Sequence, residues 1–116
     1  VQASRAAGIE PPLDTVWVDL KDTEGLTASA IRCRQLGYQG KMCIYPDQVP
    51  VVNDVFTPTA AEIATARKMV AAFDEAEKAG LASIQVDGKF IDYPIVYRAQ
   101  RVLATVERIA ARKGRG

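Results

Sequence analysis

The sequence predicts an α/β fold, and two features of the chain indicate it. Two short apolar runs, 13–20 and 41–44, have the length and composition of buried strands. A helical pattern over 26–36 lies between them, so residues 13–48 have the strand–helix–strand order of a parallel βαβ unit. Two parallel strands cannot cover both of their faces alone, so we expect this unit to be part of a larger sheet or barrel.

The amino-acid composition argues against several kinds of partner and of catalytic site. The chain has 116 residues, with 15 basic and 14 acidic side chains, so nothing in its net charge favours nucleic acid or an anionic membrane as a partner. Its hydrophobic residues, 48% of the chain, suffice for a core, but no apolar run is long enough to span a bilayer. Two cysteines indicate free thiols in a reducing compartment such as the cytoplasm. The absence of histidine excludes Ser-His-Asp and Cys-His catalysis within this sequence.

Glycines define the helices of the first half. Residues 1–8 are typical of a helix that ends at Gly8, and the helix over 26–36 ends at Gly37. The second strand is expected over 41–44. A short helix then follows Pro46, and Thr57-Pro58 ends it.

The second half predicts a helix, a hairpin and a helix. Thr59 and Glu62 have the spacing of a capping box, and Gly80 ends the helix that they begin. Asp87-Gly88, between short apolar runs in 82–91, indicates a hairpin. The last helix follows Asp92, with Pro94 in its first turn.

Candidate binding residues lie at the end of the second strand. The stretch 40–48 runs from an apolar strand into Tyr45, Pro46 and Gln48. Ligands of α/β sheets and barrels bind at the carboxyl ends of the strands, so these residues are candidates for a pocket wall. The alternative is that these residues form a polar turn that leads into the next helix. For Gln48 we prefer this alternative and expect its side chain to lie in solvent. Lys41 begins its strand, which favours a structural role.

The loop after the first strand is acidic. It contains Asp19, Asp22 and Glu24 together with Lys21. Paired carboxylates are ligands that Mg²⁺ accepts, but acids at the start of a helix are favoured by its dipole, and we prefer that interpretation.

A resemblance to a known family rests on an ordered set of motifs. They are Asp14-Thr15-Val16-Trp17-Val18-Asp19 with Asp22 and Gly25, Gly37-Tyr38-Gln39-Gly40-Lys41, Ile44-Tyr45-Pro46-Asp47-Gln48-Val49, Phe56-Thr57-Pro58 and Asp87-Gly88-Lys89-Phe90-Ile91-Asp92-Tyr93-Pro94. In this order and spacing the chain resembles the C-terminal portion of the citrate lyase beta subunit-like proteins. These belong to the HpcH/HpaI aldolase group, which includes malyl-CoA and citramalyl-CoA lyases.

The resemblance implies a TIM (β/α)₈ barrel with a C-terminal extension. Residues 1–56 would be the last strand–helix units of the barrel, and 57–116 a helix, hairpin and helix that act as a lid and an oligomer contact. The Glu and Asp that hold Mg²⁺ in the family, and the Arg that holds the keto acid, lie upstream of the matched portion. We therefore expect this chain to have no metal site and no turnover by itself.

The activity that the resemblance implies is carbon–carbon bond cleavage. A 3-hydroxyacyl-CoA thioester such as malyl-CoA or citramalyl-CoA would yield acetyl-CoA and a 2-keto acid, with Mg²⁺ polarising the keto oxygen. Asp92 would be the general acid/base, supplied in trans to a neighbouring subunit of a trimer or hexamer. Spacing alone favours a plain helix cap for Asp92.

One departure and two alternatives accompany the resemblance. Tyr45 stands where the family usually has His, and tyrosine lacks a group that titrates near neutral pH. The chain is alternatively a non-catalytic assembly or interaction module, or a citrate lyase beta subunit that acts on an acyl-carrier-protein thioester.

Cys33 and Cys43 are expected to be small buried apolar residues. An aromatic group is expected to pack on a neighbouring subunit: Phe90, Tyr93 and Tyr97.

Overall fold

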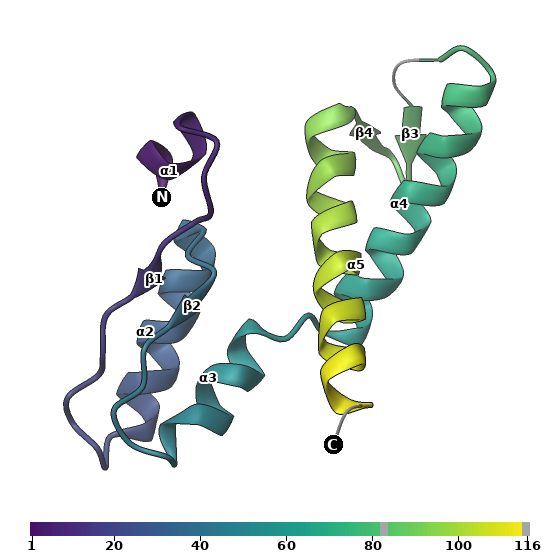
Figure 1. The fold of residues 1–116 in the computed structure, drawn as a ribbon. Coiled ribbons are helices and arrows are strands. Elements are labelled where there is room, and N and C mark those ends of the chain that lie inside the picture. The colour runs from purple at the N-terminus through teal and green to yellow at the C-terminus, as the bar shows by residue number, and fades with distance from the viewer. Residues whose placement is uncertain (82–83, 115–116) are drawn as a thin grey trace. The chain divides into compact units, whose positions relative to one another are not determined.

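The computed structural model describes residues 1–81 and 84–114, in two compact units, Val1–Thr57 and Pro58–Gly116 (Figure 1). The first unit contains α1 (Gln2–Ala6), β1 (Leu13–Asp14), α2 (Thr23–Leu36), β2 (Gly40–Lys41) and α3 (Gln48–Phe56). The second contains α4 (Ala60–Lys78), β3 (Ile84–Val86), β4 (Lys89–Ile91) and α5 (Tyr93–Lys113).

The first unit has the predicted parallel strand–helix–strand arrangement. β1 and β2 pair in parallel, with Leu13 opposite Gly40 and Asp14 opposite Lys41. α2 connects them, lies beside β2 and packs on α3 (Figure 1). Its buried residues recur at helical spacing, as the pattern over 26–36 predicts: Leu26, Ala30 and Cys33.

The strands are much shorter than predicted. Runs over 13–20 and 41–44 were expected to be buried, but each strand contributes two residues to the ladder. Leu13 is 55% exposed, Val18 77% and Ile44 54%. After Asp14 and Lys41 the backbone of these runs has no ladder partner among the described residues. Of the other apolar side chains in these runs, Val16, Trp17 and Cys43 are half-buried rather than buried.

An acidic cap fixes the start of α2. The Asp22 Oδ1 accepts a hydrogen bond from the Gly25 backbone N–H at 2.9 Å, and Glu24 lies in the first turn. This confirms the interpretation of these acids as helix-terminus residues. Because of the cap, α2 begins at Thr23 rather than at residue 26. It ends at Gly37, whose φ of 93° is left-handed.

Gly25 tolerates no side chain, which leads to a first prediction. A Cβ at this position would lie 2.0 Å from the Asp22 Oδ2 and 2.6 Å from the Trp17 Cζ2. Gly→Ala changes in helices are commonly stabilising by about 0.5–1 kcal/mol. Here we expect Gly25→Ala to lower the free energy of unfolding by about 2 kcal/mol, because the ring and the cap must both move. Urea unfolding measures this.

Gly114→Ala is the matched control for that prediction. A Cβ on Gly114 meets only backbone oxygens, at 3.7 and 3.9 Å, which is ordinary contact. We expect its free energy of unfolding to stay within about 0.5 kcal/mol of the parent. A Gly25→Ala protein as stable as the parent would show that Trp17 and Asp22 do not occupy these positions.

The second unit confirms the predicted order of helix, hairpin and helix. The Thr59 hydroxyl accepts from the Glu62 N–H at 3.1 Å, and the Glu62 carboxylate accepts from the Thr59 N–H at 3.0 Å. β3 and β4 pair antiparallel across Asp87-Gly88. Residues 82 and 83 of the expected hairpin region lie outside the described residues. The hairpin, α4 and α5 share one core: Phe73, Val86, Ile91 and Val96.

None of the helices in the described part of the chain is long and apolar enough to cross a membrane. α5 is the longest of these helices, at 21 residues. Its sequence combines apolar residues with five basic side chains, so the helix is amphipathic rather than apolar on all sides.

Candidate functional site

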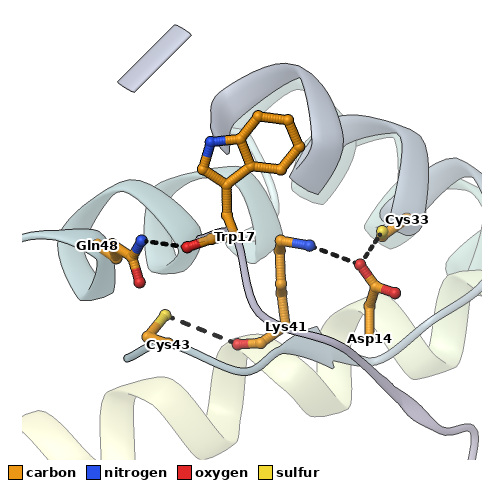
Figure 2. A network of polar contacts seen from close by, with 6 residues as sticks. All are labelled: Asp14, Trp17, Cys33, Lys41, Cys43 and Gln48. Atoms are coloured by element: carbon orange, nitrogen blue, oxygen red, sulfur yellow. Dashed lines mark hydrogen bonds and ion pairs between the residues drawn. The ribbon is translucent and has the colours of Figure 1, made fainter. Parts of the chain in front are cut away.

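Gln48 ties together the two loops that follow β1 and β2. Its Oε1 accepts from the Ile44 N–H at 3.0 Å. Its Nε2 donates to the Trp17 carbonyl at 2.9 Å (Figure 2). The side chain was expected in solvent, but the residue is only 3% exposed. That expectation was wrong because an amide carries both an acceptor oxygen and a donor NH₂ group, and these pair with backbone groups that burial would otherwise leave unpaired.

Tyr45 and Pro46 form the exposed part of the same turn. The Tyr45 carbonyl accepts from the Gln48 N–H at 3.0 Å, and the Pro46 carbonyl accepts from the Val49 N–H at 3.1 Å. Tyr45 is 44% exposed, and Pro46 is exposed as well. Of the three predicted wall residues, these two are therefore open to a ligand at this end of the strands. The Gln48 amide instead makes hydrogen bonds within the protein. Contact with a ligand stays a prediction.

Asp92 lies in the second unit, between β4 and α5. It follows Ile91, which is 1% exposed and so anchors this junction in the core. The Asp92 carboxylate is half-buried and caps α5, since its Oδ1 accepts from the Ile95 N–H at 3.4 Å. The cap interpretation is confirmed. That hydrogen bond is long and uses only one of the two carboxylate oxygens.

The structure also contains a polar network that sequence reasoning missed. The Asp14 Oδ2 accepts from the Lys41 Nζ at 2.6 Å and from the Cys33 Sγ at 2.7 Å (Figure 2). The Lys41 side chain is 2% exposed and that of Asp14 20%. Lys41 is thus structural, as predicted, and Cys33 is buried but acts as a hydrogen-bond donor rather than as a purely apolar residue. No pattern within one segment could have found the network, because it depends on the parallel register, which places Asp14 opposite Lys41.

The network shifts the pKa values of Asp14 and Cys33 in opposite directions. The Cys33 thiol, followed by the Lys41 ammonium, lowers the pKa of Asp14 by hydrogen bonding. Burial, followed by the hydrogen bond to Asp14, raises the pKa of Cys33. At neutral pH the carboxylate is therefore ionised and the thiol protonated, so Cys33 is no nucleophile.

These shifts predict a two-sided pH dependence of stability. Because folding lowers the pKa of Asp14, its carboxylate stabilises the folded state at pH values above the unfolded pKa. This stability is lost as pH falls through the folded pKa. The raised pKa of Cys33 contributes stability that is lost as pH rises past the thiol's ordinary value of 9.0. Urea unfolding across pH 2–11 should show that Asp14→Asn removes part of the acid slope and Cys33→Ser part of the alkaline slope. Parallel curves for parent and variants would contradict the network.

The loop after β1 does not gather into a metal site. In residues 1–81 and 84–114, no three Asp, Glu or Cys side chains come close enough together to hold a metal ion. Asp22 instead caps α2, and the Asp19 Oδ1 accepts from the Lys21 N–H at 3.2 Å. The acids of this loop do not fit a Mg²⁺ site by themselves.

Known proteins resemble this chain over almost all of its length. It is 43% identical over 103 residues to the citrate lyase subunit beta of Leuconostoc mesenteroides subsp. cremoris, which covers 89% of this chain and 34% of that protein. It is 40% identical over 109 residues to a (3S)-malyl-CoA thioesterase of Cereibacter sphaeroides, covering 94% and 38%. The chain thus spans little more than a third of these curated relatives. No family model matches it.

A solved structure shares the fold. The protein CitE from Mycobacterium tuberculosis, in complex with magnesium, acetoacetate and coenzyme A, aligns with a TM-score of 0.72 at 30% identity. The alignment covers 89% of this chain and 37% of that one. These comparisons confirm the resemblance drawn from the ordered motifs, and with it an α/β fold of this general type.

Proposed function

Because this chain is homologous to part of the citrate lyase beta subunit-like proteins, we propose that its full-length protein is a carbon–carbon lyase. The substrate would be a 3-hydroxyacyl-CoA thioester such as malyl-CoA or citramalyl-CoA, and the products acetyl-CoA and a 2-keto acid. The observation that carries the proposal is similarity over 89–94% of the chain to proteins named for citrate cleavage and malyl-CoA chemistry. A structural neighbour in complex with coenzyme A and acetoacetate supports the substrate class.

We further propose that residues 1–56 are the last strand–helix units of a (β/α)₈ barrel and 57–116 a C-terminal extension. The parallel pairing of β1 and β2 through α2 supports the first part. The exposed apolar residues of these strand segments support it too, since further strands would cover them: Leu13, Val18 and Ile44. Tyr45 and Pro46 would then lie at the mouth of the barrel, as walls of the pocket.

Asp92 is the proposed general acid/base. Cleavage of the carbon–carbon bond leaves an enolate at the acetyl carbon, and Asp92 would protonate that carbon; in condensation it would remove the same proton. A half-buried carboxylate at a helix start suits this role, since its position is fixed by the cap and one oxygen is unoccupied. In the proposed assembly, a trimer or hexamer, Asp92 acts in trans on a neighbouring barrel.

Mg²⁺ enters the proposal only through residues outside this chain. The acids described here do not fit a site for it, so its ligands would be the Glu and Asp expected upstream. Tyr45 provides a phenolic hydroxyl at the pocket where His is usual in the family. Tyrosine keeps a hydrogen-bond donor but does not titrate near neutral pH, which leaves proton transfer to Asp92.

Two other activities are favoured by particular relatives. Similarity to a citrate lyase subunit beta favours an acyl-carrier-protein thioester as substrate. Similarity to (3S)-malyl-CoA thioesterases favours hydrolysis of malyl-CoA. A purely structural module for assembly is the non-catalytic alternative.

Product analysis of the full-length protein tests these possibilities. With malyl-CoA and Mg²⁺ we expect acetyl-CoA and glyoxylate, whereas a thioesterase would release free CoA and malate. Turnover of the acyl-carrier-protein thioester alone would identify a citrate lyase subunit. An assembly module would turn over none of them. Chromatography with mass detection separates these outcomes in one experiment.

A further inference from the structure

Helix α5 carries a row of exposed side chains that begins directly after Asp92. Counted from Tyr93, its members follow one another at intervals of four, four, seven and four residues, which places them along one face of the helix. Val96 and Ala99 of the same helix are buried, whereas all members of the row are exposed. We call this surface the α5 row: Tyr93, Tyr97, Arg101, Arg108 and Arg112.

The α5 row changes from aromatic to basic along the helix. The Tyr93 ring packs edge-to-face on the buried Phe73 ring at a centroid distance of 4.9 Å, and the Tyr97 ring lies 6.1 Å from that of Tyr93. Such rings offer apolar area together with a hydroxyl group that can donate a hydrogen bond. The arginines that follow offer forked donors that fit a phosphate group. From Asp92 onward, the helix therefore presents an acid, an aromatic wall and then positive charge.

The positive charge of the α5 row is not neutralised within the described chain. Among residues 1–81 and 84–114, no arginine of the row forms an ion pair with a carboxylate. Glu107 is the acidic residue of α5, but it adjoins Arg108 in sequence, and such neighbours point to different sides of a helix. A solvated helix face usually carries charges of alternating sign. A row of arginines without acids is instead suited to an anionic ligand.

We propose that the α5 row binds the CoA portion of the thioester substrate, with Arg101 at the diphosphate and Arg108 at the 3′-phosphate. This rests on the proposed function, in which Asp92 protonates the methyl carbon of acetyl-CoA. An arm with amide groups follows that carbon in the substrate, then a diphosphate, then a nucleotide with a 3′-phosphate. The row presents complementary groups in the same order, because its tyrosines come first and its arginines follow.

The lengths of the substrate and of the helix agree. About fifteen bonds separate the methyl carbon of acetyl-CoA from the first phosphorus atom, or about 17 Å in an extended chain in which three bonds span about 3.4 Å. Arg101 follows Asp92 by nine residues, about 14 Å along the helix, and Arg108 follows it by sixteen residues, about 24 Å. Arg101 is therefore at the distance of the diphosphate, and Arg108 is within reach of the nucleotide end alone.

Calorimetric titration of the full-length protein with CoA and with 3′-dephospho-CoA tests the proposal. We expect Arg101→Ala to raise the Kd of both ligands about 10-fold, because both contain the diphosphate. Arg108→Ala should raise the Kd of CoA about 10-fold and that of 3′-dephospho-CoA less than about 2-fold, because only CoA has the 3′-phosphate. Arg67→Ala removes an exposed arginine of α4 outside the row and is the matched control, for which both Kd values should equal those of the parent.

Three results would overturn the proposal. One is a Kd for CoA that neither row variant changes. Another is an Arg108→Ala protein that loses equal affinity for the two ligands, since the loss would then not come from the 3′-phosphate. The third is a loss of affinity that occurs only where sedimentation velocity shows a changed assembly.

Failure of this proposal is distinguishable from failure of the proposed function, because binding is measured without turnover. A full-length protein that cleaves malyl-CoA, while both row variants bind CoA like the parent, would refute only the role of the α5 row. Arginine-dependent binding of CoA without cleavage of malyl-CoA would refute only the lyase activity.

Discussion

Replacing Asp92 with Asn in the full-length protein is expected to lower kcat for thioester cleavage about 10²- to 10⁴-fold. The asparagine amide has nearly the same shape but can neither protonate the enolate carbon nor remove a proton from acetyl-CoA. Binding of the CoA portion does not depend on this group, so KM should change little. Steady-state kinetics with malyl-CoA, following keto acid release, measures both quantities.

The choice of asparagine separates catalysis from capping. Asparagine caps helices as well as aspartate does, so Asp92→Asn should retain the bond to the Ile95 N–H and the parent stability. Asp92→Ala should lose about 1 kcal/mol of stability as well as activity. Asp74→Asn, an exposed change on α4, is the control for loss of one carboxylate. A kcat that is the same in Asp92→Asn and parent would leave Asp92 with only the structural role.

Removing Asp14 is expected to cause the largest loss of stability. Asp14→Ala leaves the Lys41 ammonium, whose side chain is 2% exposed, without its carboxylate partner at 2.6 Å. Breaking a buried ion pair from one side commonly costs about 3–5 kcal/mol. The Asp14 side chain is 20% exposed, and water that enters there lowers the cost, so we expect about 3 kcal/mol. Urea unfolding at pH 7 measures the change.

Two further variants make that prediction specific. Lys68→Ala breaks the pair with Asp87 at 2.5 Å, whose side chains are 58% and 66% exposed, and should cost under about 0.5 kcal/mol. Asp14→Leu combined with Lys41→Met removes both charges together and should recover most of the loss, because no buried charge remains. A single Asp14→Ala change that costs under about 1 kcal/mol would contradict the buried network.

Local sequence rules predicted the hairpin and several helix ends correctly, although α2 begins three residues before the predicted start. The Thr59–Glu62 capping box, Gly37 with its left-handed φ and the Asp87-Gly88 turn each depend on a few neighbouring residues. Such signals act over one turn of chain, so they hold whatever the rest of the molecule does.

The extents of the strands were not predictable in the same way. An apolar run such as 13–20 indicates a strand, but its ladder length depends on which other backbone lies beside it. In this structure the ladder ends at Asp14 and Lys41. The burial of Gln48 and the bonds of Asp14 also depend on pairing between segments that are 19 to 31 residues apart. Periodicity within one segment carries no information about such pairing.

The candidate site was predictable as motifs rather than as geometry. The ordered set of motifs from Asp14 to Pro94 indicated the homology that the comparisons confirm. It also drew attention to Asp92, for which spacing alone predicts a cap, and the cap is present. Tyr45 and Pro46 lie exposed at the carboxyl ends of the strands, where a parallel unit presents its loops. How these groups meet a substrate depends on residues beyond those in this chain.

Cleavage of malyl-CoA by the full-length protein in D₂O tests the lyase proposal and the role of Asp92 together. Protonation of the enolate by a solvent-exchanged acid should place one deuterium in the methyl group of the acetyl-CoA product, as read by mass spectrometry. The Asp92→Asn variant should form this product at least 100-fold more slowly. Release of free CoA and unlabelled malate, or labelled acetyl-CoA formed at the parent rate by the variant, would contradict the proposal.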